Sequence, residues 1–269
     1  MQSGSWGEGR INKNNPPDWK EGVGCGVWGV RKPLSSVGVK IFSSGLTPDD
    51  QLLTPPTNFL PQTLVMSDLR QYAPATERNR QPILEVLSQF LPKTGNILEI
   101  SSGTGEHAVF FAPRLAPCRW IPSDCNPLAL DSIRSWCDYY PSSNLDRPLF
   151  IDVHQSVWAV ETENIVINAI VNINMIHIAP WSACLALMAG ASRILSSGEI
   201  LYLYGPYKRQ GKHTSPSNES FDFSLRSQNS AWGVRNLEDV VQAASDRGLQ
   251  LLEVIPMPAN NLSVLFQLP

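Results

Sequence analysis

Hydrophobic and polar positions repeat with two different periods along most of the chain. Apolar residues recur every three or four positions over 83–91, which is typical of an amphipathic helix. Short apolar runs bounded by small or polar residues are typical of strands. The pattern predicts strands at 96–100, 119–122, 149–152, 164–174 and 199–204, and further helices at 106–115, 126–140, 181–195 and 237–247. Because strands and helices alternate, we expect a doubly wound α/β fold, in which a mostly parallel sheet carries helices on both faces.

The end of the chain has a different pattern. Two apolar runs, 249–255 and 262–268, follow one another with only a short proline- and asparagine-containing connection between them. Two strands joined so closely pair as an antiparallel hairpin. We therefore expect this hairpin to add an antiparallel strand beside the last parallel strand of the sheet.

The composition changes near residue 66. Residues 1–65 hold 9 of the 18 glycines and 7 prolines, carry a net charge of +1 and show neither helical nor strand periodicity. A segment of this kind buries too little apolar surface to offset the entropy of ordering it. We expect residues 1–65 to be disordered, or to be a gene-model extension with translation starting at Met66. Residues 66–269 are predicted to form one folded domain.

Charge and cysteine content exclude several classes of protein. The net charge is −3, which does not favour binding of this protein to nucleic-acid phosphates. No uninterrupted apolar stretch is long enough to span a membrane. The five cysteines form no C-x-x-C pair, which argues for reduced thiols and against a zinc site. The first residues lack the apolar core of a secretory signal. We expect a cytoplasmic protein without a metal.

The most informative segment is ILEISSGTGEHA at 97–108. Gly103, Gly105 and Ala108 follow a predicted strand and open a predicted helix, the arrangement that lets a backbone turn tightly and approach a nucleotide. Asp124 lies 21 residues after Gly103, at the end of the second strand, where a carboxylate can bind both hydroxyls of a ribose. The constellation fits either a nicotinamide nucleotide or S-adenosylmethionine, because both contain an adenosine ribose.

Three features favour S-adenosylmethionine. Glu99 precedes the glycines at the position where a carboxylate can contact the amino-acid end of the ligand or anchor the loop. Asp152 and Val153 follow the third strand, where they can contact the adenine, and the antiparallel strand is absent from many doubly wound dehydrogenases. The Y-x-x-x-K spacing of Tyr204 and Lys208 does not rescue the dehydrogenase, because the glycine and proline between them prevent the helix that this pair needs.

The chain after residue 66 resembles the methyltransferase-like proteins grouped as domain-of-unknown-function family 938. The resemblance is carried by the stretches YAPATERNR (72–80), LEISSGTGEH (98–107), NMIHIAPW (174–181), YGPY (204–207), SNESFDFSLR (217–226), QNSAW (228–232) and MPANN (257–261). It implies a Rossmann-like class I methyltransferase fold that binds S-adenosylmethionine. Ser101 stands where the general methyltransferase pattern has its first glycine. The resemblance supplies no methyl acceptor.

Polar residues near the ends of the fourth and fifth strands are the candidates for catalysis. Methyl transfer needs an aligned acceptor, and it needs a base only where the acceptor must lose a proton. The candidates are Asn174, His177, Tyr204, Tyr207 and Asn218. For Asn174 and His177, loop-capping hydrogen bonds are an equal alternative, and for Asn172 they are preferred. Residues 208–226 are expected to form a long polar loop that covers the acceptor. Arg226 either binds a carboxylate or phosphate of the acceptor or pairs with Asp222, and the pairing is preferred.

These observations predict a methyltransferase that uses S-adenosylmethionine and acts on an unknown acceptor, either a small molecule or a protein. The residues expected to hold the cofactor are Glu99, Ser101, Gly103, Gly105, Asp124, Asp152, Val153 and Asn174. Two alternatives remain open at this point. One is an NAD(P)-dependent oxidoreductase, and the other is a non-catalytic scaffold that binds the cofactor.

Overall fold

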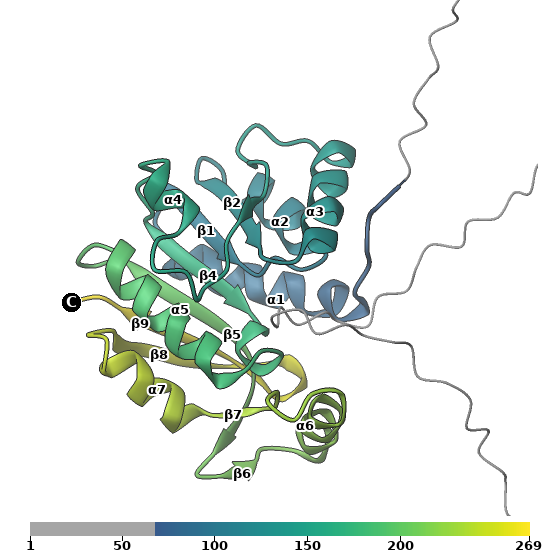
Figure 1. Cartoon of the computed structure of the whole chain (residues 1–269), viewed down its shortest axis with the longest axis vertical. Helices are drawn as coiled ribbons and strands as arrows, with labels where there is room; N and C mark the ends of the chain where they lie inside the picture. The colour runs from purple at the N-terminus through teal and green to yellow at the C-terminus, as the bar shows by residue number, and fades with distance from the viewer. Residues whose placement is uncertain (1–67) are drawn as a thin grey trace, which may run out of the picture.

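A computed structural model describes residues 68–269 of the chain. The expectations for residues 1–65, and for a start at Met66, lie outside the described residues. The described part is built on one sheet in the order β3-β2-β1-β4-β5-β9-β8, with β6 and β7 beside β5 (Figure 1). The strands are β1 (Asn96–Ile100), β2 (Arg119–Asp124), β3 (Leu149–Phe150), β4 (Ala169–Ile173), β5 (Ile200–Arg209), β6 (Lys212–His213), β7 (Arg235–Asn236), β8 (Gln250–Met257) and β9 (Asn261–Gln267).

The sheet has the predicted mixture of directions. Strands β1 to β5 are parallel to their neighbours in the main order, and β9 lies between β5 and β8 and is antiparallel to both. The predicted hairpin is therefore confirmed. Since β1 lies in the middle, next to β2 and β4, the carboxyl ends of these three strands meet at one edge, where doubly wound folds bind ligands.

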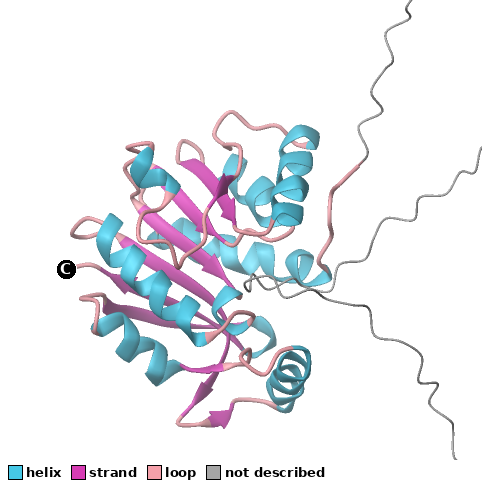
Figure 2. Cartoon of the chain, in the orientation of Figure 1, coloured by secondary structure: helices cyan, strands magenta, loops and turns pink. Residues whose placement is uncertain are grey.

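Helices cover both faces of the sheet (Figure 2). The longer helices are α1 (Pro74–Phe90), α3 (Pro127–Tyr139), α5 (Trp181–Ile194), α6 (Pro216–Gln228) and α7 (Leu237–Ser245), and α2 (Glu106–Phe111) and α4 (Ala159–Thr162) are short. One apolar layer joins α4, α5 and α7 to the sheet, and the other joins α1 and α2 to it. Successive side chains of β1 point to opposite faces of the sheet, so Leu98 and Ile100 pack in the first layer and Ile97 packs in the second.

Local signals explain the element boundaries that were predicted well. Asn126 caps α3 through its side chain, which accepts a hydrogen bond from the backbone N–H of Leu128 at 2.9 Å, and Pro127 occupies the first helical turn. Gly248, with a φ of +80°, follows α7 in the left-handed conformation that commonly ends a helix. Cys118, Cys137 and Cys184 are free and buried.

The helix predicted over 106–115, which the sequence allows to stop or kink at Pro113, is α2 up to Phe111 and then a 3-10 turn, Ala112–Arg114, because Pro113 cannot donate the next hydrogen bond. Three other expectations need correction. The strand predicted over 149–152 is only Leu149–Phe150. The strand predicted over 164–174 is only Ala169–Ile173. The long loop predicted over 208–226 is instead the end of β5, strand β6 and most of α6.

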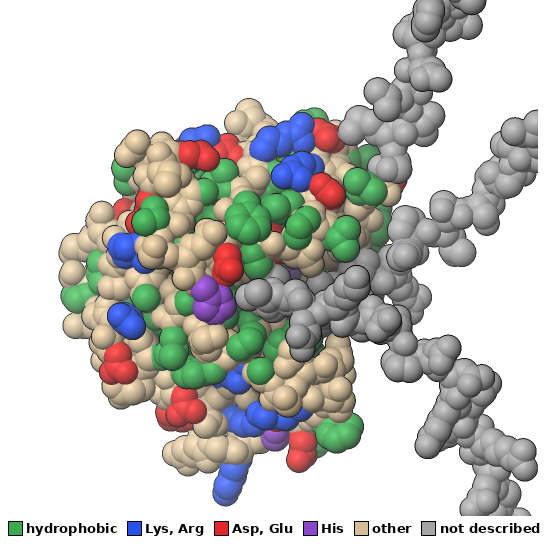
Figure 3. Space-filling view, in the orientation of Figure 1, with side chains coloured by type: hydrophobic (Ala, Val, Ile, Leu, Met, Phe, Trp, Pro, Cys, Tyr) green, Lys and Arg blue, Asp and Glu red, His purple; other side chains and the backbone are tan. Residues whose placement is uncertain are grey.

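No helix in residues 68–269 is long and apolar enough to cross a membrane. On the face drawn in Figure 3, positive and negative side chains are interspersed among neutral ones, without an extended area of one sign.

Candidate functional site

The loop after β1 turns sharply at the carboxyl edge of the sheet. Ser101, Gly103 and Gly105 have positive φ angles of 57°, 58° and 89°. A Cβ atom added at Gly103 would meet no atom within 4 Å, so this part of the loop faces open space. A Cβ added at Gly105 would lie 2.9 Å from Cα of Ile133 in α3. The first glycine therefore leaves room for a ligand, whereas the second lets α2 pack against α3.

Asp124 joins the end of β2 to this loop. Its Oδ2 accepts a hydrogen bond from the backbone N–H of Gly103 at 3.0 Å, and its Oδ1 accepts one from Asn126 at 2.8 Å. The residue is buried. Burial raises the pKa of the carboxyl, while the hydrogen bonds from the backbone oppose the shift. Each oxygen keeps further acceptor capacity, so Asp124 both fixes the loop and is able to accept hydrogen bonds from a ligand.

Glu99 is a fully buried carboxyl group beneath the loop. Its Oε2 accepts hydrogen bonds from Oγ of Ser102 at 2.9 Å and from Nε1 of Trp120 at 3.0 Å. Burial raises the pKa of Glu99 to about 7, the two hydrogen bonds lower it, and the nearby Asp124 carboxylate raises it further. A carboxyl group with this pKa, in contact with a cleft, is typical of a site that binds a charged ligand.

A narrow cleft lies between the loop and the first turns of α1. Its lining includes Glu99, Ser101, Gly103 and Asn174 among the predicted site residues, and also Thr76, Asn79, Ser102, Thr104 and His107. The approach to α1 is fastened over the loop, because the backbone N–H of Ala73 donates to Oε2 of Glu106, which also accepts from Oγ1 of Thr104 at 3.0 Å. The structure therefore brings residues from α1, β1 and β4 together around one cleft.

A chain of polar side chains borders this cleft. Asn79 contacts Nε2 of His107 through its Oδ1 at 2.9 Å, and it also forms a side-chain hydrogen bond with Tyr204 in the middle of β5. Burial lowers the pKa of His107 to about 3, so its imidazole is neutral at physiological pH. Burial also raises the pKa of Tyr204 to about 12. Tyr204 is therefore a neutral phenol that reaches the cleft lining through its hydrogen bond with Asn79.

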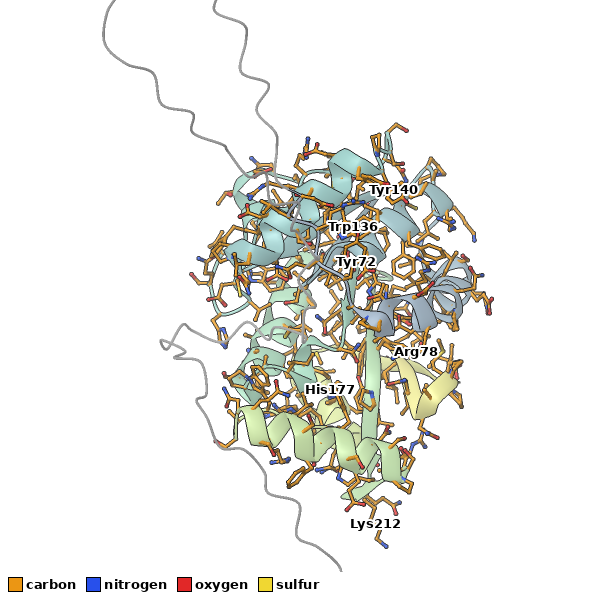
Figure 4. The ribbon with its side chains drawn as sticks, turned by 90° about the vertical axis from the view of Figure 1, so that its right-hand side faces the viewer. Tyr72, Arg78, Trp136, Tyr140, His177 and Lys212 are labelled. Carbon is orange, nitrogen blue, oxygen red and sulfur yellow. The ribbon has the colours of Figure 1, made fainter. Side chains whose placement is uncertain are left out.

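Asn174 and His177 lie in the segment that follows β4, but they differ in position. Asn174 has a left-handed backbone with a φ of 65° and lines the cleft. His177 is fully buried behind Gly205, where an added Cβ would lie 2.5 Å from its Nε2. Its pKa falls to about 3 because of burial, with Arg235 contributing. Figure 4 shows His177 inside the fold, below Arg78. In this arrangement the imidazole does not reach the cleft, and its Nε2 has no partner among the described residues.

Asn218 and Asp222 bind other parts of the protein rather than the cleft. Nδ2 of Asn218 donates to Oγ1 of Thr214 at 3.0 Å and to the carbonyl oxygen of Asn260 at 2.9 Å. Asp222 is contacted by Lys208, His213, Arg226 and the backbone N–H of Val234 at distances between 2.7 and 3.3 Å. The predicted pair of Arg226 and Asp222 is confirmed. These contacts fasten α6 to the end of β5 and to the connection between β8 and β9.

Three further predicted residues lie outside the cleft lining. Tyr207 is fully buried among the helices of the α5 face, and burial raises its pKa. Asp152 forms a turn just after β3, where its Oδ1 accepts a hydrogen bond from the backbone N–H of His154 at 3.0 Å. Val153 packs in the adjoining apolar layer. Asn172 is buried inside β4 rather than in a loop. Its Nδ2 donates to the carbonyl oxygen of Ile100 at 2.9 Å, whereas its Oδ1 has no partner among the described residues.

Sequence reasoning did not include Thr76, Ser102 and Thr104 among the cofactor residues, although the cleft contains all three. The signal for them was weak, because hydroxyl side chains next to glycines are as common in ordinary turns as in binding loops. Thr76 lies within the stretch YAPATERNR, one of the unusual motifs of the sequence. No group of metal-binding side chains occurs within residues 68–269.

Comparison with known families decides the relationship. The family described as "Protein of unknown function (DUF938)" matches residues 70–268. The chain belongs to the DUF938 family. Because this family carries no assigned activity in its description, membership confirms the resemblance seen in the sequence motifs but supplies no reaction.

Solved structures show what the DUF938 fold resembles. An O-methyltransferase family protein from Burkholderia thailandensis matches with a TM-score of 0.60 and 13% identity, over 72% of this chain and 57% of that one. An O-methyltransferase family 2 protein from Planctomyces limnophilus, in complex with apigenin, matches with a TM-score of 0.59 and 16% identity, over 72% of this chain and 59% of that one. Human N-acetylserotonin methyltransferase, in complex with SAM, matches with a TM-score of 0.59 and 12% identity, over 72% of this chain and 52% of that one.

These similarities establish the fold. At such low identity they do not transfer an activity, but they show that this DUF938 chain has the class I methyltransferase architecture predicted from its sequence. The chain spans a little more than half of the length of these solved proteins.

Proposed function

We propose that the protein is a methyltransferase that uses S-adenosylmethionine and acts on a small-molecule or protein acceptor. The observation that carries the proposal is the loop after β1. It faces open space at Gly103 and is fixed by Asp124 at the carboxyl edge of the sheet. The same edge carries the buried carboxyl of Glu99. Together with the class I methyltransferase fold, these features fit a ligand that contains both a ribose and an amino-acid group.

The residues divide the work of holding this cofactor. Asp124 would accept hydrogen bonds from the ribose hydroxyls, and the backbone at Ser101 and Gly103 would pass close to the ligand. Glu99, Ser102 and Asn174 would face its amino-acid end. Asp152 and Val153 would lie on the adenine side, as predicted from their place after β3. When bound, the cofactor supplies an electrophilic methyl group on a sulfonium.

The protein's own contribution is alignment and exclusion of water. The turns at the start of α1 close the cleft from above, and the polar chain of His107, Asn79 and Tyr204 borders it on the side of β5. The neutral phenol of Tyr204 is available to hydrogen-bond an acceptor oxygen or nitrogen. Alignment of the reacting atoms supplies much of the acceleration in such reactions. Asn174, next to the same cleft, is the second residue suited to orienting the acceptor.

A small-molecule acceptor has additional support. The solved Planctomyces protein with this fold is in complex with apigenin, a small molecule. The cleft lining in this chain contains no cluster of acidic or basic side chains that would select a charged protein segment. The oxidoreductase alternative has no comparable support, because Tyr204 and Lys208 lie on a strand rather than on a helix. A cytoplasmic location stays a prediction.

Binding by two matched variants tests the proposal. Asp124→Ala removes the carboxylate from the loop, and we expect it to weaken S-adenosylhomocysteine binding by about 1.5–3 kcal/mol for each charged hydrogen bond lost. Asp131→Ala removes an exposed carboxylate of α3 that pairs with Arg134, and it should leave the affinity unchanged. Equal affinities for the two variants in calorimetric titration would contradict the assignment of the loop.

Turnover separates the enzyme from the non-catalytic scaffold. Labelled S-adenosylmethionine is incubated with the full chain and fractionated small-molecule extracts, and transfer of the label to an extract component is measured. We expect transfer that requires Asp124. Binding without transfer across extracts and across protein fractions would favour the scaffold.

A further inference from the structure

A hollow separate from the cofactor cleft lies on the outer surface of α1, α2 and α3. It encloses about 520 Å³, which falls within the range of small-molecule sites. One side is formed by α1 and α2 and the other by the end of α3 and the residues that follow it. Nothing in the proposed methyl transfer uses this hollow, and its interpretation does not depend on that reaction.

Aromatic rings form the α3 side of the hollow. Trp136 and Tyr140 are stacked, with ring centroids 5.8 Å apart, and Tyr139 meets Tyr140 edge-on at 4.7 Å. Tyr139 and Tyr140 are more than half exposed. Figure 4 shows Trp136 and Tyr140 close to Tyr72 and far from Lys212. Exposed aromatic rings gathered at a concave surface are typical of a binding site rather than of scattered surface residues.

Two arginines form the opposite side. Cζ of Arg114 lies 3.9 Å and Cζ of Arg80 lies 4.7 Å from the centroid of the Phe110 ring. Neither guanidinium forms an ion pair with a carboxylate within residues 68–269. Nη1 of Arg114 donates to the carbonyl oxygen of Phe110 at 2.9 Å, and the guanidinium N–H groups not used in this way remain available for an anion.

The one carboxylate that lines the hollow is already occupied. Oε2 of Glu106 accepts hydrogen bonds from the backbone N–H of Ala73 and from Oγ1 of Thr104. Glu106 lines the hollow rather than the cofactor cleft, and its carboxylate interacts with the charge of Arg80. The two guanidinium groups still outnumber this one carboxylate in the lining, so the hollow keeps a positive edge opposite an aromatic side.

We propose that this hollow is a binding site for a small planar aromatic ring that carries an acidic group. The ring would lie against Tyr140 and its neighbours, and the acidic group would accept hydrogen bonds from Arg80 and Arg114. A carboxylate and a phosphate both meet this requirement, because each offers two oxygens to a guanidinium. The occupant is thus an aromatic acid or an aromatic phosphate.

Calorimetric titration of the full chain with chosen probes tests the site. The probes are 2-naphthoate and 2-naphthyl phosphate, with 2-naphthylmethanol as the ring without charge and acetate as the charge without a ring. We expect saturable 1:1 binding of at least one of the two acids and none of the neutral ring or of acetate at the same concentrations. The acid that binds with the higher affinity identifies the acidic group that the site prefers.

Variants locate the binding. Arg114→Gln and Arg80→Gln should each weaken binding of the acid by about tenfold, the effect of losing a hydrogen bond to a charged group. Arg134→Gln, a matched change on the exposed face of α3 outside the hollow, should leave it unchanged. Saturating S-adenosylhomocysteine should not displace the probe.

Three results would overturn the proposal. The first is no saturable binding of either acid to the folded protein. The second is a loss of probe affinity in Arg134→Gln as large as the loss in Arg114→Gln and Arg80→Gln, which would mean that the protein attracts anions in general. The third is displacement by S-adenosylhomocysteine, which would place the probe in the cofactor cleft.

Discussion

The two glycines of the loop after β1 should respond in opposite ways to the same substitution. Gly103 and Gly105 both have positive φ angles, so alanine at either position adds about 1–2 kcal/mol of backbone strain. At Gly103 the new methyl group meets no protein atom within 4 Å, and strain is the whole cost to folding. At Gly105 it lies 2.9 Å from Cα of Ile133, and overpacking adds about 1–3 kcal/mol.

The effect on ligand binding is reversed. The methyl group of Gly103→Ala projects into the space that we assign to the cofactor, and a misfit of about 1–3 kcal/mol there weakens binding about 5- to 150-fold. Gly105→Ala turns its methyl group toward α3, so any folded protein should bind nearly as well as the natural chain. Urea unfolding measures the first effect, and calorimetric titration with S-adenosylhomocysteine measures the second.

Two results would contradict these expectations for the glycine variants. If Gly103→Ala binds S-adenosylhomocysteine with unchanged affinity, the open space above the loop is not the cofactor site. If Gly105→Ala unfolds at the same urea concentration as Gly103→Ala, the close packing against α3 does not contribute to stability.

Three other predictions concern buried polar groups. Burial raises the pKa of Glu99 from 4.5 to about 7, so its contribution to stability is present below pH 4.5 and is lost as the pH rises through 7. Glu99→Gln should therefore raise the free energy of unfolding at pH 8 by up to about 3 kcal/mol and flatten the pH dependence of that free energy in urea titrations. The same variant should weaken cofactor binding. Asn218→Ala should lower the free energy of unfolding by about 1–2 kcal/mol and leave cofactor affinity unchanged in calorimetry, since its partners are Thr214 and Asn260. Asp222→Asn leaves the charges of Lys208 and its neighbours uncompensated and should cost about 1–3 kcal/mol in urea unfolding, whereas Asp131→Asn, an exposed pair, should cost less than about 1 kcal/mol.

Local sequence signals predicted the elements that hold the candidate site. The strand, the turn at Gly103 and the acidic residue at Asp124 have the spacing that nucleotide-binding folds require, and the structure places these two residues 3.0 Å apart through Oδ2 and N. Asn126 and Pro127 mark the start of α3 because a side-chain cap and a proline both fit the first turn of a helix. The two apolar runs and their short connection predict the hairpin at the end of the chain.

The helix α6 was not predicted, and the reason is physical. Its inward positions include Asn218, Asp222 and Leu225, which have helical spacing, but two of the three are polar. A search for hydrophobic periodicity therefore finds no helix there, although Ser215 and Pro216 form a good N-terminal cap. Only the donors brought together in the fold explain why an aspartate is buried on this face.

The candidate catalytic residues were harder to judge for a related reason. A polar residue after a strand at the carboxyl edge of a sheet either faces the ligand or supports the loop, and the sequence pattern is the same in both cases. Asn174 and Tyr204 belong to the cleft and its border, whereas His177 and Tyr207 are turned into the protein. The direction of each side chain depends on contacts with distant segments, such as Arg235 against the segment after β4.

The central claim is that this chain binds S-adenosylmethionine at the loop after β1. Calorimetric titration of the full chain with S-adenosylmethionine, S-adenosylhomocysteine, NAD and NADP tests it most directly. The account predicts saturable binding of the first two ligands, weakened in Gly103→Ala, and no binding of the dinucleotides. Binding of NAD or NADP in place of the first two would contradict it and favour the oxidoreductase.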